Sequence, residues 1–133
     1  MLSVILVAVT VQILLGGAVS GIATYPSKPV RIDSVGGLIS AISSAGGPAL
    51  LLHATLGVLI FVMGIGVAFS SLRYHKRSVT IMAALDLVTI SLALAGGFLW
   101  ASSDFSNTGA VTLMGSMATI AYAFLFLTLY FTK

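Results

Sequence analysis

The distribution of charged residues constrains this chain most, because it leaves uncharged runs long enough to cross a bilayer. Of the 133 residues, 59% are hydrophobic and 7% charged, whereas soluble domains carry about 25% charged residues. The longest run without Asp, Glu, Lys or Arg extends from Ser34 to Leu72. A membrane-spanning helix needs about 20 apolar residues. The sequence therefore predicts one integral membrane domain, residues 1–133, with no room for a separate soluble domain.

The apolar segments predict four membrane-spanning helices. The expected spans are residues 2–24, 48–71, 79–101 and 109–131. A secretory signal is the alternative for the first segment, but Met1-Leu2-Ser3 lacks the basic region with which such signals begin. We therefore expect a retained helix, and an all-α integral membrane fold built as a four-transmembrane-helix bundle.

The first loop, residues 25–47, is long and allows two interpretations. Pro26 ends the first helix, because proline cannot continue the hydrogen-bonded ladder. After it, Val35, Leu38, Ile39 and Ile42 recur at helical spacing, which indicates a short interfacial helix. The glycines in the same stretch are equally consistent with an ordered surface loop.

The basic loop Arg73-Tyr74-His75-Lys76-Arg77 predicts the orientation of the chain. Positive residues in short loops stay on the cytoplasmic side, so both termini are expected in the cytoplasm of a multi-pass protein of the cell membrane. Lys28 and Arg31 in the outer loop oppose this assignment mildly. The net charge of +3 comes from loops and the C-terminus. This charge indicates the orientation of the chain in the membrane, so no nucleic-acid partner is expected.

The two halves of the chain are similar to each other at constant offsets, which predicts two tandem two-helix repeats. Sites in repeat-built membrane proteins often lie at the interface between the repeats. The first and third spans share Val9-Thr10-Val11 and Gly17 with Val88-Thr89-Ile90 and Gly96, and the second and fourth share His53-Ala54-Thr55-Leu56-Gly57 with Met117-Ala118-Thr119-Ile120-Ala121.

His53 and Met117 are the candidate cofactor ligands, because they occupy equivalent positions in the two repeats and both side chains can ligate haem iron. An ionisable residue at membrane depth is a functional-site hypothesis by default. Gly57 and Ala121 lie one turn deeper and lack the bulk that would exclude a porphyrin, so haem b is the expected cofactor. The alternatives are a neutral histidine hydrogen-bonded across helices and a methionine that only packs. Met114, about one turn earlier, could replace Met117.

Asp86 lies inside the third span, about two turns from its basic end. A charged carboxylate at the membrane centre costs roughly 2.5–3.5 kcal/mol on insertion scales. We therefore expect Asp86 to be neutral, or paired with Thr, Ser or Gln side chains of neighbouring helices. A proton relay or a quinone contact is the functional interpretation. His53 belongs to the opposite half of the membrane and should not touch it.

Several chemistries are excluded by the residues that the sequence lacks. Cysteine is absent, which excludes disulfides, thiolate metal sites, iron–sulfur clusters and covalent c-type haem. The chain offers no nucleophile–base pair, phosphate-binding glycine loop or cluster with metal-ligand spacing. No catalytic residue is predicted, which favours a protein without catalytic activity of its own.

The segment Val11-Gln12-Ile13-Leu14-Leu15-Gly16-Gly17-Ala18-Val19-Ser20-Gly21, followed by a long loop and then His53, resembles one four-helix half of the haem A synthase family. The resemblance covers most of the chain. It implies a haem-binding fold in which His53 matches a ligating histidine and Met117 stands where the family has its second histidine. Ala54 replaces the Arg or Gln common in the family, and the catalytic glutamate and the loop cysteines are missing. The resemblance therefore implies haem binding rather than the synthase reaction.

Three functions follow as hypotheses. The first is a small haem-b-binding subunit of a respiratory or electron-transfer complex, with quinone as a further partner. The second is a structural accessory subunit of a larger membrane complex that binds only lipid and partner helices. The third is a reduced protein similar to haem A synthase, which the missing glutamate disfavours.

Overall fold

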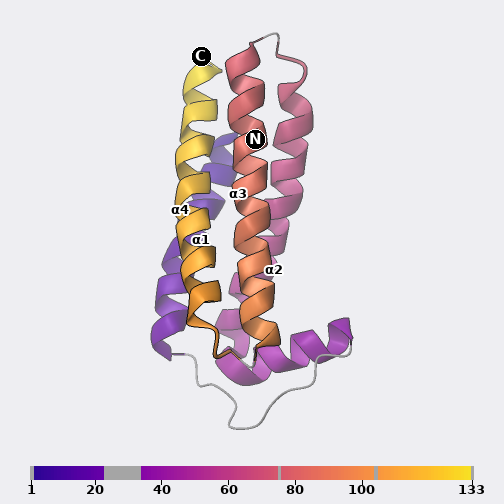
Figure 1. The fold of residues 1–133 in the computed structure, drawn as a ribbon, viewed down its shortest axis with the longest axis vertical. Helices are drawn as coiled ribbons and strands as arrows, with labels where there is room; N and C mark the ends of the chain where they lie inside the picture. Colours follow the sequence, from indigo (N-terminus) through magenta and orange to yellow (C-terminus); the bar gives the residue numbers. More distant parts are fainter. Residues whose placement is uncertain (1, 23–33, 75, 104, 133) are drawn as a thin grey trace.

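The protein is an all-helical membrane bundle. The computed structural model describes residues 2–22, 34–74, 76–103 and 105–132. These residues form four helices, which alternate in direction along the chain (Figure 1). The helices are α1 (Leu2–Ile22), α2 (Val35–Ser71), α3 (Arg77–Ser102) and α4 (Thr108–Phe131). Each contains a segment long and apolar enough to cross a membrane, so the predicted fold class is confirmed, and no described residue is in a strand.

Polar residues set the helix ends. Ser34 caps α2, and its hydroxyl oxygen accepts a hydrogen bond from the Gly37 backbone N–H at 3.1 Å. Asn107 caps α4, and its side-chain oxygen accepts from the Ala110 backbone N–H at 3.0 Å. Such caps satisfy backbone donors that the first turn of a helix leaves free. The described helix boundaries therefore follow the short polar loops that the sequence places between apolar runs.

A sharp bend divides α2 into two parts. Gly47 has φ 58° and ψ −151°, a left-handed conformation that glycine adopts without the steric cost of a Cβ. Pro48 follows and cannot donate the hydrogen bond that a continuous helix would need. The segment before the bend lies across the end of the bundle in Figure 1, and Gly47–Ser71 is the spanning part. Of the two interpretations of this stretch, the short helix is confirmed. We call residues 35–46 the cap helix.

The cap helix buries a different face from the one predicted. Val35 and Ile39 are 74% and 48% exposed, whereas Ala41 and Ala45 are fully buried. The two alanines belong to one apolar cluster that also contains Val19, Leu50, Ala101 and Phe105, with Leu38 and Ile42 packed against it. Small side chains lie at the contact because they let this helix approach the end of the bundle closely.

The four helices pack as a ring, in which each touches its two neighbours and the diagonal pairs, α1 with α3 and α2 with α4, do not pack directly within the described residues. The tightest approach is between α3 and α4 at Gly96. A Cβ there would lie 3.0 Å from both the Ala110 carbonyl oxygen and the Met114 backbone nitrogen. Gly17, its counterpart in the sequence repeat, has no neighbour within 4 Å of a Cβ. The repeat positions thus have different surroundings.

The outer surface is rich in bulky apolar side chains, as expected for helices in contact with lipid acyl chains. Examples are Val4, Val7 and Leu14 on α1, Leu59, Val62 and Phe69 on α2, Val88 and Phe98 on α3, and Phe126 and Tyr130 on α4. The protein is therefore a multi-pass membrane protein.

The contrast between Gly96 and Gly17 gives the first prediction. Gly96→Ala should destabilise the bundle by about 1–3 kcal/mol, the usual cost of overpacking, because backbone atoms of α4 must move away. Gly17→Ala is the matched control and should leave stability unchanged or raise it, since alanine favours helix. Both can be measured by far-UV circular dichroism during unfolding in mixed detergent–dodecyl sulfate micelles. Equal stability of the two variants would contradict the tight α3–α4 contact.

Candidate functional site

The candidate site begins at His53, which lies on α2 just after the bend at Gly47. Its half-buried imidazole faces α1. The side-chain amide nitrogen of Gln12 donates a hydrogen bond to the His53 carbonyl oxygen at 3.0 Å. The same amide nitrogen lies 3.4 Å from the imidazole Nε2. A single glutamine therefore contacts both the backbone and the ring of His53, and it connects α1 to α2.

Two glycines make room for this pair. A Cβ at Gly16 would lie 3.0 Å from Cε1 of the His53 ring, and a Cβ at Gly57 would lie 3.1 Å from the Gln12 amide nitrogen. Real Cβ atoms seldom come so close, so larger residues would displace the pair. The space beside Gly57, predicted to admit a porphyrin, is next to the Gln12 amide in this structure.

Two polar atoms of the pair are buried without a hydrogen-bond partner among the described residues: Oε1 of Gln12 and Nδ1 of His53. If the Gln12 N–H donates to Nε2, the imidazole proton must sit on Nδ1, where no acceptor faces it. Leaving a buried polar group unsatisfied costs about 1–3 kcal/mol. Nδ1 is therefore the atom of this pair that a further ligand or a shifted side chain would satisfy.

The other predicted ligand, Met117, lies on the opposite side of the ring of four helices. It is half-buried on α4, the helix diagonal to α2. Ala121 is 1% exposed and belongs to the interior apolar cluster with Val9 and Ile60. Met114 packs against α3, because its sulfur would lie 3.3 Å from a Cβ at Gly97. The structure thus brings His53 and Gly57 together with α1, and places Met117 and Ala121 on the helix diagonal to α2.

Gln12 is the residue of this site that the sequence patterns did not single out. It is the single glutamine of the chain and lies within an otherwise apolar span. Amide and imidazole side chains in membrane helices commonly hydrogen-bond across helices. A lone amide at membrane depth was therefore a signal that could have been paired with His53.

Asp86 forms a separate site on α3. It is 1% exposed, and neither carboxyl oxygen has a hydrogen-bond partner among the described residues. The Thr89 hydroxyl one turn away donates instead to the backbone carbonyls of Leu85 and Asp86, at 3.0 and 2.9 Å. The predicted pairing with neighbouring polar side chains is therefore not present. Within the described residues no three of His, Cys, Asp or Glu cluster as a metal site would require.

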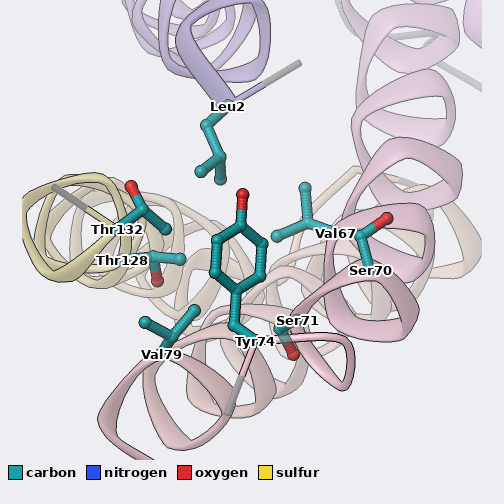
Figure 2. Close-up of a pocket in the computed structure, with 8 residues that line it drawn as sticks. All are labelled: Leu2, Val67, Ser70, Ser71, Tyr74, Val79, Thr128 and Thr132. Atoms are coloured by element: carbon teal, nitrogen blue, oxygen red, sulfur yellow. The ribbon is translucent and has the colours of Figure 1, made fainter. Parts of the chain in front are cut away.

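A cavity of about 250 Å³ opens at the end of the bundle that carries Arg73, Lys76 and Arg77, which we call the basic end. Figure 2 shows the Tyr74 ring at its centre, with the hydroxyl directed toward Leu2. We call this cavity the basic-end pocket. Its walls carry the hydroxyl side chains Ser70, Ser71, Tyr74, Thr128 and Thr132 and the apolar side chains Leu2, Val67 and Val79.

Fold and site together define a four-helix membrane bundle with one interhelical histidine–glutamine pair and one buried acid. Comparison with family models, with curated proteins and with solved structures gave no match to this chain.

The His53–Gln12 contact gives the second prediction. Gln12→Ala and His53→Ala should each destabilise the bundle, and the double variant should lose less than the sum of the two. Interhelical hydrogen bonds in membranes couple by about 0.6 kcal/mol on average and up to ~1.7 kcal/mol, so a coupling in that range is expected. Unfolding of the four proteins in mixed micelles provides the cycle. Strict additivity would show that the pair does not hold α1 to α2.

Proposed function

We propose that this chain is a non-catalytic membrane subunit that packs against helices of partner membrane proteins in a larger assembly. The observation that carries the proposal is the exposed face of α4 over its first three turns. There the exposed residues are all small or hydroxylated: Thr108, Gly109, Thr112, Gly115, Ser116 and Thr119. Large exposed apolar side chains on α4 begin only at Ile120.

This small-residue face is longer than the other exposed one, which Gly17, Ala18 and Ser20 form near the end of α1. The stretch from Thr108 to Thr119 rises roughly 17 Å at 1.5 Å per residue, about half of a ~30 Å hydrocarbon core. Nothing lies within 4 Å of a Cβ built at Gly115. Between membrane helices the hydrophobic effect gives no drive to associate, and interfaces use Gly, Ala, Ser and Thr to bring backbones close. A partner helix would therefore gain more contact at this face than lipid chains do.

The His53–Gln12 pair supports the same proposal. Each side chain occupies the space beside a glycine of the opposite helix, as interhelical packing requires. In this interpretation His53 fixes the angle between α1 and α2 and carries no cofactor.

Haem b at His53 and Met117, in a subunit of an electron-transfer complex that would also contact quinone, is the second candidate function. The buried, unpartnered Nδ1 of His53 favours it. The packing around the ring does not fit the group, because Nε2 faces the Gln12 amide and the ring lies against Gly16. Iron ligation would require His53 to leave both contacts, so we derive no electron-transfer step through haem.

The third prediction tests the small-residue face. Ser116→Leu should separate the chain from its assembly, because a bulky side chain blocks close helix approach. Ser20→Leu, at an exposed serine of α1, is the matched control and should remain assembled. Native electrophoresis of membranes extracted in mild detergent measures the result. Wild-type protein that migrates as a single 13.7 kDa chain under these conditions would refute the proposal.

A visible spectrum of the same purified wild type separates the two candidates. We expect no Soret band when haem is supplied during expression. A band that His53→Ala removes while the helical circular dichroism persists would establish the haem candidate in place of ours.

We also propose that the basic end faces the cytoplasm, because short loops rich in Lys and Arg are retained there. The start of α1 and the end of α4 lie at this end, since Leu2, Tyr74 and Thr132 line one pocket. The fourth prediction uses the natural absence of cysteine. Cysteines at Ser34 and Ser106 should react with an impermeant thiol reagent added outside intact cells, and one at Lys76 should react only after lysis. The reverse pattern would overturn the orientation.

A further inference from the structure

The basic-end pocket lies among all four helices and carries hydroxyl groups in a lining that is otherwise apolar. Five of its lining residues carry hydroxyl groups, and α1, α2, α3 and α4 each contribute to it (Figure 2). Ser71, Thr128 and Thr132 donate their hydroxyl protons to carbonyls of their own helices, at 2.7, 2.8 and 2.7 Å. Their oxygen lone pairs remain available to accept hydrogen bonds. A site that is roomy and polar can hold water, which needs ~30 Å³ per molecule and two to four polar partners.

The inner wall of this pocket reaches the depth of Asp86. Two contacts align α2 with α3: a Cβ at Gly64 would lie 3.2 Å from the Ile90 Cδ1, and the Thr80 hydroxyl donates to the Ser71 carbonyl at 3.3 Å. Val67 lines the pocket and lies between Gly64 and Ser71. It is therefore level with the part of α3 between Thr80 and Ile90, where Asp86 lies.

Asp86 also lies on the helix face that lines the bundle interior. Ala83 and Ile90, three residues before it and four after it, are both in the interior cluster, and Val79, seven residues before it, lines the pocket. Seven residues of helix amount to about 10 Å. Asp86 thus lies roughly two turns along α3 from Val79, on the same face of the helix.

The side of Asp86 away from the pocket is apolar. Val9, Ile60, Ile90 and Ala121, one from each helix, are all buried in the interior cluster. These residues close the bundle between Asp86 and the His53–Gln12 pair. The hydroxyl-bearing pocket therefore lies on one side of the carboxyl group only, with Val67 and Ala83 of the same cluster as the thin apolar layer between them.

Among the described residues, no other ionisable side chain lies beside Asp86. Residues 2–22 of α1 contain none, and His53 of α2 lies beyond the apolar layer. On α4, Tyr122 and Tyr130 are exposed on the outer surface. The aqueous end is marked by Tyr74 in the pocket and by the exposed cations Arg73, Lys76 and Arg77. Asp86 thus has no counter-ion among the described residues, and a permanently ionised, unpaired carboxylate would be too costly at this depth.

We propose that Asp86 is a protonation site with one-sided access, which exchanges its proton with water that enters through the basic-end pocket. The step is a simple transfer. The carboxylic acid gives its proton to a pocket water and becomes a carboxylate, and the hydronium ion passes to the aqueous phase at the basic end; uptake is the reverse. The site would serve as a proton donor or acceptor on that side of the membrane, independently of whether the chain packs against partners.

The fifth prediction tests this exchange by infrared spectroscopy of the full chain in lipid nanodiscs. Wild type should show a carboxylic-acid carbonyl band that is missing from Asp86→Asn, and the band should shift when the buffer is changed to D₂O. Val67→Phe fills the inner pocket and should slow this shift by at least about tenfold, equivalent to a barrier ~1.4 kcal/mol higher. Val62→Phe, the same change at a lipid-facing position of α2 that is 57% exposed, should exchange at the wild-type rate.

Ser70→Phe blocks the pocket from its exposed side, and it provides the same measurement if Val67→Phe does not fold. Circular dichroism establishes that each variant is folded. The proposal is overturned if the Asp86 band does not shift in D₂O, if no such band exists at any pH at which the bundle stays folded, or if a folded pocket-filling variant exchanges as fast as wild type.

Discussion

The hydrocarbon core of a bilayer offers no hydrogen-bond partners, and this constraint governs where polar side chains lie in the described spans. Backbone groups are satisfied within helices. Short hydroxyl side chains bond to the carbonyl one turn back on their own helix, as Thr10, Thr119 and Thr128 do at 2.8, 3.0 and 2.8 Å. Gln12, His53 and Asp86 form no such bond within their own helix. Among the described residues, the buried side-chain polar atoms without partners all belong to these three. The candidate sites are thus the positions at which a side chain finds no hydrogen-bond partner within its own helix.

These three residues divide between two depths. The Gln12–His53 contact joins neighbouring helices near the end covered by the cap helix, where glycines on both helices give it room. Asp86 has no such contact and lies toward the basic end, near a pocket with hydroxyl-bearing walls. Interior apolar residues such as Ile60 and Ala121 separate them. In one half of the bundle, polar side chains join two helices. In the other half, polar side chains line a pocket that opens to water.

Much of the architecture could be predicted from the sequence, because the bilayer imposes length and apolar composition on each span. The four spans agree with the described helices to within a few residues at most ends. The partner of His53 could not be predicted in the same way. The sequence repeat related His53 to Met117, whereas its hydrogen-bond neighbour in the structure, Gln12, comes from α1. Helix order in the bundle, which the repeat does not encode, decides that α2 packs on α1 and α3. The small-residue contacts of the cap helix were missed because its apolar pattern emphasised bulky residues, whereas close approach depends on Ala41 and Ala45.

The cap helix has a consequence for the order in which the protein is completed during synthesis. Its buried alanines share a cluster with Ala101 and Phe105, which follow them only after two further spans have been made. Until the turn between α3 and α4 leaves the ribosome, Ala41 and Ala45 lack the part of their packing surface that Ala101 and Phe105 supply. The α2–α3 hairpin needs no such wait, because its two helices are consecutive. Closure of this end of the bundle is therefore a late event in biogenesis, and the chain passes through a stage in which the cap helix lies at the membrane surface without its final contacts.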